Sequence, residues 1–187
     1  MEPKPLREGR SLSPDQRALA DGLRRLGAIK FGKFTLTSGA ESSYYLDVKL
    51  ALTEPGFLSL IADQMLQYVA GHQRIAGMEL GAVPLVVALS LKRKIPYVVI
   101  RKSVRGHGTG REIEGELGQG ENVLVVEDVA TTGGSLRTTI RAVREWGGVV
   151  DKAVCVIDRE EGAVRRLMEV GVELIPLLTA TNLLAPQ

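Results

Sequence analysis

The fold is decided by one stretch of sequence, Val123-Leu-Val-Val-Glu-Asp-Val-Ala-Thr-Thr-Gly-Gly-Ser135. The apolar run 123–126 predicts a buried strand, and a helical pattern follows the stretch. Two adjacent carboxylates, Glu127 and Asp128, lie where the strand is expected to end. Because ligands of parallel α/β sheets bind at the carboxyl ends of the strands, this stretch predicts a binding site.

The hydroxyl- and glycine-rich loop after the acid pair suits a phosphate group. Glycines let backbone N–H groups approach an anion, and the N-terminus of the following helix favours negative charge. Ionised carboxylates only accept hydrogen bonds, which suits the hydroxyls of a sugar. The loop is not a P-loop, since no Lys-Ser or Lys-Thr follows its last glycine. The stretch therefore predicts a ribose 5-phosphate site; the alternative is a buried strand, a turn and a capped helix without a ligand.

The composition is that of an ordinary globular chain of 187 residues, 44% hydrophobic and 25% charged, which fits one domain. A formal net charge of +2 argues against a nucleic-acid binder. No apolar segment is long enough to cross a membrane, and the N-terminus lacks the apolar core of a signal peptide. The single cysteine, Cys155, lies in an apolar run and is interpreted as a small buried side chain. Together these features predict a cytoplasmic protein that binds neither membrane nor nucleic acid.

Strand and helix patterns alternate along most of the chain. Ser13, Pro14 and Gln16 form a capping-box pattern at the start of the first helix. Helices are expected at 14–26, 55–70, 84–92, 136–146 and 160–170, and strands at 75–78, 97–101, 123–127, 149–157 and 172–178. This alternation predicts a mainly parallel α/β sheet with helices on both faces. We expect a single domain over residues 1–187, with a flexible tail at 1–12 and a small hood at 29–49 over the carboxyl edge of the sheet.

Residues 102–122 show neither a helical nor a strand pattern. This polar, glycine-rich segment leaves the ligand-binding end of the strand expected at 97–101. Its beginning is cationic, with Arg101, Lys102, Arg105 and His107. Beside a phosphate site, such a segment predicts a mobile loop that closes over an anionic substrate, whereas the alternative is a solvated hairpin.

The stretch 123–135 resembles the phosphoribosyl-pyrophosphate motif of the type I phosphoribosyltransferases. Three further segments resemble one group in that family, the orotate phosphoribosyltransferases. Residues 30–39 with 42–47 resemble their hood, 101–108 their catalytic loop, and Asp158-Arg159 the position of their orotate-binding arginine. The resemblance runs from about Leu26 to Arg159 and implies the type I phosphoribosyltransferase fold.

This resemblance implies a reaction and its participants. Orotate and 5-phosphoribosyl 1-pyrophosphate would give orotidine 5′-monophosphate and pyrophosphate, a step of pyrimidine (UMP) biosynthesis. The cofactor would be Mg²⁺, held mainly through substrate and water rather than by direct protein ligands. The family also implies a homodimer with shared active sites, in which part of the catalytic loop comes from the partner subunit.

The resemblance also assigns roles to single residues. The catalytic group comprises Lys102, His107 and Asp128. Contacts to the phosphoribosyl donor are implied for Arg101, Lys102, Arg105, His107, Glu127, Asp128, Val129, Ala130, Thr131, Thr132, Gly133, Gly134 and Ser135. Orotate would contact Lys30, Tyr45, which follows Tyr44 in the aromatic stretch, Thr131 and Arg159. Gly77 and residues 79–84 match the short pyrophosphate loop.

The chain departs from the family pattern at a few positions. Arg105 replaces the usual lysine, and Gly106 and Thr109 stand where acidic residues often occur. Gly81-Ala82 lacks a lysine that some members carry, so a pyrophosphate contact there would come from the backbone. Two alternatives stay open: a purine phosphoribosyltransferase, against which the hood and Arg159 argue, and a non-catalytic nucleotide-sensing regulator on the same fold.

Overall fold

A six-stranded sheet forms the centre of the molecule, in the order β5-β4-β3-β6-β7-β8. The computed structural model describes residues 12–35, 41–102 and 112–184. The strands are β3 (Arg74–Met78), β4 (Tyr97–Ile100), β5 (Ile113–Glu114), β6 (Val123–Ala130), β7 (Lys152–Asp158) and β8 (Glu173–Thr179). Neighbouring strands are parallel except β5, which pairs antiparallel with β4. The prediction of a mainly parallel sheet is confirmed.

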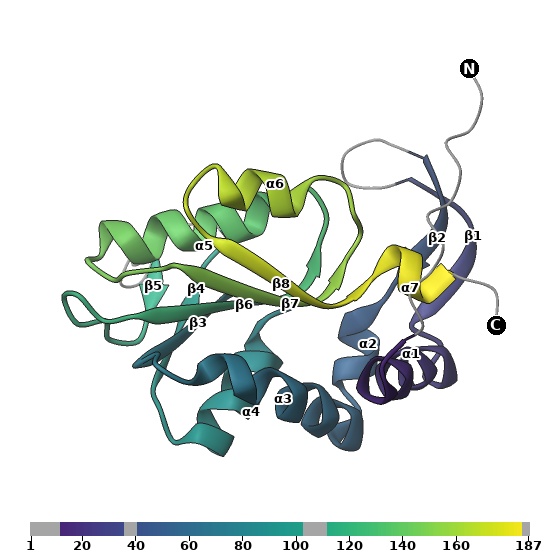
Figure 1. The fold of residues 1–187 in the computed structure, drawn as a ribbon, viewed down its shortest axis with the longest axis horizontal. Helices are drawn as coiled ribbons and strands as arrows, with labels where there is room; N and C mark the ends of the chain where they lie inside the picture. Colours follow the sequence, from purple (N-terminus) through teal and green to yellow (C-terminus); the bar gives the residue numbers. More distant parts are fainter. Residues whose placement is uncertain (1–11, 36–40, 103–111, 185–187) are drawn as a thin grey trace.

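Helices cover both faces of this sheet (Figure 1). One face is covered by α3 (Pro55–Val69) and α4 (Val83–Arg93), with α1 (Pro14–Arg25) beside them, and the other by α5 (Gly134–Glu145) and α6 (Ala163–Met168). The short α7 (Ala180–Leu184) follows β8. Leu124 and Val126 pack into the core on the first face, and Val123 and Val125 into the core on the second. This two-sided burial explains why β6 begins with an unbroken apolar run.

The first helix begins as its sequence predicts. Gln16 N donates to Ser13 Oγ at 3.2 Å, and Ser13 N donates to Gln16 Oε1 at 3.1 Å, so the capping box is confirmed. Gly27, at φ 65°, follows the end of the helix and turns the chain into the next strand. Among the described helices, none is both long and apolar enough to cross a bilayer.

Residues 29–46 form a separate two-stranded antiparallel ribbon of β1 (Ile29–Thr35) and β2 (Glu41–Leu46). The segment predicted as a hood also contains the start of a helix, α2 (Val48–Leu52), which the sequence analysis did not predict. In Figure 1 the ribbon lies at one end of the molecule, beyond α1 and α2. It meets the main body at Arg159, whose Nη2 lies 3.3 Å from Ser42 Oγ.

Three predicted boundaries are wrong. The strand expected to end at Glu127 continues to Ala130, because β6 still pairs with β7 there. The strand expected from 149 begins at Lys152. The helix expected over 160–170 is limited to α6, since Glu160 (φ 60°) and Gly162 (φ 102°) have left-handed backbones that cannot continue a right-handed helix.

The prediction that 102–122 is irregular is wrong for Ile113–Glu114. These residues pair with β4 as an edge strand, and Ile113 is buried in the core. Arg101 N donates to Glu112 O at 2.9 Å and continues this pairing. Residues 103–111 lie outside the described residues, and the mobility predicted for 102–122 stays a prediction.

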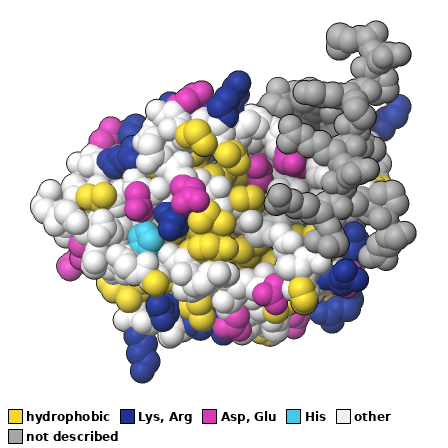
Figure 2. Space-filling view, in the orientation of Figure 1, with side chains coloured by type: hydrophobic (Ala, Val, Ile, Leu, Met, Phe, Trp, Pro, Cys, Tyr) yellow, Lys and Arg dark blue, Asp and Glu magenta, His cyan; other side chains and the backbone are white. Residues whose placement is uncertain are grey.

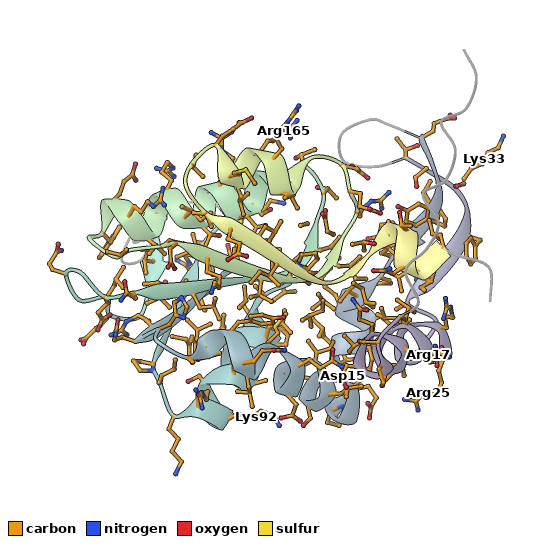
Figure 3. The ribbon with its side chains drawn as sticks, viewed as in Figure 1. Asp15, Arg17, Arg25, Lys33, Lys92 and Arg165 are labelled. Atoms are coloured by element: carbon orange, nitrogen blue, oxygen red, sulfur yellow. The ribbon has the colours of Figure 1, made fainter. Side chains whose placement is uncertain are left out.

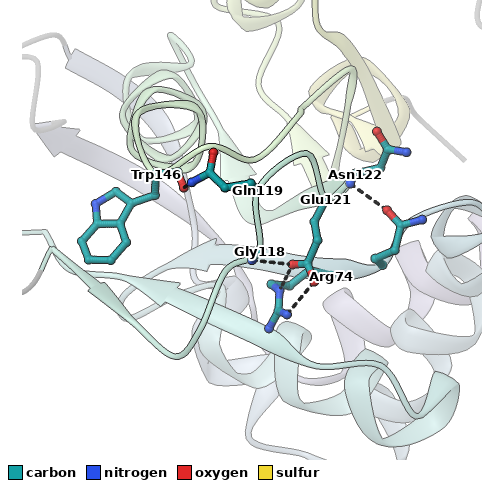
Figure 4. A network of polar contacts seen from close by, with 7 residues as sticks. Arg74, Gly118, Gln119, Glu121, Asn122 and Trp146 are labelled. Carbon is teal, nitrogen blue, oxygen red and sulfur yellow. Dashed lines mark hydrogen bonds and ion pairs between the residues drawn. The ribbon is translucent and has the colours of Figure 1, made fainter.

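The chain between β5 and β6 is held by a polar network at the amino end of β3 (Figure 4). The buried Arg74 donates from Nε and Nη2 to the two oxygens of Glu121, at 2.5 and 2.9 Å. Glu121 also accepts a hydrogen bond from Gly118 N at 3.1 Å. The arginine lowers the pKa of the Glu121 carboxyl and keeps it ionised. This network holds residues 118–121, the last part of the segment predicted as a loop, beside the amino end of β3.

Candidate active site

The acid pair lies inside the last half of β6 and is largely buried. Glu127 is 6% exposed and Asp128 7%. Asp128 Oδ1 accepts the N–H of Val129 at 2.8 Å, and Glu127 Oε1 accepts that of Asp128 at 3.2 Å. The second oxygen of Asp128 lies 3.7 Å from Lys49 Nζ. Both carboxylates are thus fixed at the base of a site, rather than in a solvated turn.

Burial and the neighbouring Asp128 charge raise the pKa of the Glu127 carboxyl well above its usual range. An ionised carboxylate in this position lacks enough donors around it. Two hydroxyl groups of a ribose would supply such donors. The electrostatics of the acid pair therefore favour a diol ligand.

A cavity of about 750 Å³ opens in front of these carboxylates. Its wall is formed by residues of α2, β3, β6, α5 and the segments after β3 and β4: Lys49, Met78, Glu79, Leu80, Gly81, Lys102, Glu127, Asp128 and Ser135. The floor is acidic and two lysines stand on the wall. Such a lining can receive a sugar on the floor and an anionic group above it.

The loop after β6 forms a second, small concavity of about 20 Å³, lined by Glu127 and by Val129–Leu136 except Thr132. Its shape depends on Gly133, whose φ of 80° is left-handed and favours glycine. The loop leads directly into α5, so the N–H groups of its last residues lie at a helix N-terminus. Arg166 Nη1, from α6, donates to Thr132 O at 2.9 Å and supports the loop from behind. This geometry suits a phosphate.

Arg159 follows β7 and its side chain is buried where the hood meets the sheet. Its backbone N donates to Ala130 O at 2.8 Å, which fixes it beside the end of β6. Its guanidinium lies over the Tyr44 ring, 4.6 Å from the ring centre, and its Nε donates to Glu161 Oε1 at 2.7 Å. Burial raises the pKa of the Tyr44 hydroxyl, which keeps the ring neutral under the cation. A buried, oriented guanidinium is a suitable receptor for a carboxylate.

Two residues expected at the orotate site do not lie beside Arg159. Lys30 and Tyr45 are register partners in the ribbon, and Lys30 Nζ pairs with Asp47 Oδ2 at 2.9 Å. The Tyr45 ring lies against Phe34, with ring centres 5.6 Å apart. Because side chains alternate along a strand, Tyr44 and Tyr45 point to opposite faces of β2. The structure thus brings Tyr44, the first residue of the predicted aromatic stretch, under Arg159, whereas the contacts of Lys30 and Tyr45 with orotate stay predictions.

The predicted pyrophosphate loop follows β3 directly. The Glu79–Leu80 peptide is cis. Glu79 Oε1 accepts the backbone N–H of Lys102 at 2.9 Å, which joins this loop to the end of β4. A Cβ on Gly81 would lie 2.5 Å from the Asp128 carboxyl, so the loop packs against the acid pair with no room for a side chain. Gly77 is equally confined, since its Cβ would lie 2.6 Å from that of Ala82.

The cationic loop is described only at its beginning. Lys102 lines the large cavity, whereas Arg101 pairs with Glu114 of β5 through Nε, at 3.4 Å. Arg105 and His107 lie outside the described residues, and their predicted contacts stay predictions.

Sequence reasoning missed three residues that the fold brings to the site: Lys49, Glu161 and Arg166. Glu161 lies two residues after Arg159 and could have been suspected from its charge. Lys49 lies at the end of the segment predicted as a hood, and Arg166 lies in a helix that was interpreted as scaffold. Neither residue belongs to a motif, so neither gave a signal of its own.

Comparisons with known proteins agree with this geometry. Residues 55–175 match the family described as the phosphoribosyl transferase domain. The chain is 47% identical over 167 residues to an orotate phosphoribosyltransferase of Methanothermobacter thermautotrophicus, covering 89% of this chain and 93% of that one. It is 50% identical over 165 residues to an orotate phosphoribosyltransferase of Thermoplasma volcanium, covering 88% and 98%.

Solved structures show the same relationship. The orotate phosphoribosyltransferase of Aeropyrum pernix superposes with a TM-score of 0.82 at 35% identity, covering 89% of this chain and 96% of that one. An adenine phosphoribosyltransferase of Leishmania donovani shares the fold, with a TM-score of 0.71 at 19% identity. The match covers 93% of this chain and 87% of that one. With the acid pair, the phosphate loop and the buried arginine at one sheet edge, the chain belongs to the orotate phosphoribosyltransferase group of the phosphoribosyltransferase family.

Proposed function

We propose that this chain transfers the ribose 5-phosphate unit of 5-phosphoribosyl 1-pyrophosphate to orotate, giving orotidine 5′-monophosphate and pyrophosphate in pyrimidine biosynthesis. The observation that carries the proposal is the placement of three receptors along one sheet edge. Glu127 and Asp128 offer acceptors for a diol, the loop 131–135 offers N–H groups for a phosphate, and Arg159 offers a guanidinium for a carboxylate. The names of the relatives fit this set of ligands.

The reaction breaks the bond from ribose C1 to a pyrophosphate oxygen and forms a bond from C1 to a ring nitrogen of the base. Positive charge develops on the sugar as pyrophosphate leaves. The buried carboxylates below the ribose stabilise this charge, and they hold the two hydroxyls in a fixed position. The chain needs no nucleophile of its own for this displacement, and Cys155 is buried in the core with its thiol pKa raised well above the usual range by burial.

Arg159 sets the choice of base. Its guanidinium is already oriented by Tyr44 and Glu161, so little ordering is needed when a carboxylate binds. Uracil and the purines lack this carboxylate, which argues against a purine phosphoribosyltransferase. In the face shown in Figure 2, cationic and anionic side chains are interspersed, which fits a small-molecule enzyme better than a regulator that binds nucleic acid.

We further propose that the reaction uses Mg²⁺. In the parts of the chain that the structure describes, no three His, Cys, Asp or Glu side chains form a metal-binding group. Oxygen ligands are those that hard cations prefer, and Glu127 and Asp128 supply carboxylate oxygens at this cavity, so they would help to hold the ion, together with substrate oxygens and water. When bound, Mg²⁺ would neutralise part of the pyrophosphate charge.

A homodimer with shared active sites and a cytoplasmic location complete the proposal. Sharing can be tested by mixing a Lys102→Ala subunit with an Asp128→Asn subunit. Each single variant should be nearly inactive, but one site of the mixed dimer would contain both intact residues. A verified heterodimer without any recovered activity would show that the loop serves its own subunit.

The function itself is tested by turnover assays with orotate, uracil and hypoxanthine side by side. Orotate should be the only efficient substrate, and Asp128→Asn should reduce turnover sharply while the melting temperature stays close to that of the wild type. Asp63→Asn, on the surface of α3, is a matched control for the substitution. Near-native turnover of Asp128→Asn, or a preference for hypoxanthine, would contradict the proposal.

A further inference from the structure

Lys49 is a cation at the large cavity to which the sequence analysis assigned no role. It lies in α2, whose neighbouring side chains Val48, Ala51 and Leu52 are buried and fix the helix on the body of the molecule. The Lys49 side chain itself is 53% exposed and points to the cavity, with Nζ 3.7 Å from Asp128 Oδ2. It thus stands between the acidic floor and the open part of the site.

The segment 79–81 after β3, which also lines the cavity, carries no cationic side chain. The loop after β3 presents Gly81, and a side chain at this position would collide with the Asp128 carboxyl. A lysine could therefore not be accommodated in the present position of that loop. Lys49 approaches the same carboxylate from the side of α2, and Lys102 stands on the wall formed by the end of β4. The cavity thus has two lysines beside the segment 79–81.

We propose that Lys49 binds the pyrophosphate group of the donor and supplies the positive charge that the glycine loop cannot carry. This role rests on the proposed function, because it assigns a further contact in the same site. The segment 79–81 and Lys102 line the same cavity as Lys49, whereas Arg159 and Tyr44, the receptors assigned to the base, do not. Diphosphate oxygens are therefore its partner, rather than the orotate carboxylate.

The ion pair with Asp128 does not prevent this role. Pairs with one largely exposed member contribute little stability, so Nζ can leave Asp128 when a more highly charged anion arrives. Release of Lys49 also frees the Asp128 oxygen for a ribose hydroxyl. Lys49 can therefore bind the pyrophosphate of the donor while Asp128 binds its ribose.

The test compares two fragments of the donor by titration calorimetry: pyrophosphate in the presence of Mg²⁺, and ribose 5-phosphate. Lys49→Met should raise the Kd for pyrophosphate about ten- to a hundred-fold, as expected for loss of one charge-assisted contact, and leave that for ribose 5-phosphate within about two-fold. Lys49→Arg should keep most of the pyrophosphate affinity. Lys92→Met is the matched control, since Lys92 belongs to α4 in the α3–α4 layer (Figure 3), does not line the large cavity and pairs with Asp63 at 2.8 Å.

The proposal is wrong if Lys49→Met leaves pyrophosphate binding unchanged, or if the wild type does not bind pyrophosphate. It is also wrong if ribose 5-phosphate binding is weakened as much as pyrophosphate binding, because Lys49 would then only position Asp128. Turnover with orotate, measured on the wild type, tests the proposed function independently of these affinities.

Discussion

Glu127→Gln should stabilise the protein while it impairs the reaction. The Glu127 carboxyl is 6% exposed, accepts one backbone N–H at 3.2 Å and adjoins a second carboxylate. Burial of a polar group without full compensation costs about 1–3 kcal/mol. An amide of the same shape keeps the acceptor oxygen and removes the charge, so most of this cost should be relieved. For a chain of this size, the expected gain in Tm is about 2–10 °C.

The gain should depend on pH in a defined direction. Because burial and Asp128 raise the pKa of folded Glu127, its ionisation opposes folding at pH values above that raised pKa. As pH falls below the folded pKa, the carboxyl takes up a proton in the folded state and the penalty decreases, and it is lost below the pKa of the unfolded state. The advantage of Glu127→Gln should thus be greatest in mildly alkaline buffer and small near the ordinary glutamate pKa of about 4.3.

Thermal unfolding followed by circular dichroism at about pH 8 and pH 5 measures this difference. Glu169→Gln is a matched control, since Glu169 is largely exposed and only weakly paired with Arg165. A Tm of Glu127→Gln equal to or below that of the wild type at pH 8 would refute the reasoning. If the same variant also loses turnover, the Glu127 carboxylate is needed for binding the ribose although its burial lowers stability.

Three other substitutions test different parts of the molecule. Arg159→Ala should raise the KM for orotate roughly ten- to a hundred-fold, as expected for one charge-assisted contact, and change that for the donor much less; equal changes would make Arg159 structural. Arg74→Met should lower stability in urea unfolding by about 1.5–3 kcal/mol, because it leaves Glu121 without its partner, and a much smaller loss would mean that the network adds little. Gly133→Ala should cost about 1–2 kcal/mol through its left-handed backbone, and weaken binding of ribose 5-phosphate as measured by calorimetry; unchanged affinity would show that the phosphate loop tolerates the strain.

The local pattern of the sequence was sufficient to predict the central sheet and the helix layers on its two faces. Four apolar residues in a row, 123–126, can be buried on both faces only in a central strand, and the following loop and helix identify the site edge. The capping box at Ser13 is likewise a local interaction, completed within one helical turn. Such features are predictable because the residues that cause them are neighbours in the chain.

The ends of elements depended on tertiary pairing instead. β6 continues past the acid pair because β7 lies alongside it, and Ile113 joins the sheet because the edge of β4 is open to it. The acid pair does not by itself show that β6 continues, and the polar, glycine-rich sequence around Ile113 does not show that a strand forms there. The sequence also left open which of Tyr44 and Tyr45 packs against Arg159, since this depends on which face of β2 turns toward the arginine.

The sequence by itself determined that a diol clamp, a phosphate loop and an arginine lie at one edge of a parallel sheet, because residues after parallel strands must meet there. Only the tertiary structure brought Lys49 to Asp128, Glu161 to Arg159 and Arg166 to the phosphate loop. The physical reason is the distance along the chain over which each kind of interaction acts. Backbone periodicity and capping act over a few residues, whereas the charge around a buried carboxylate is set by side chains that converge from distant segments.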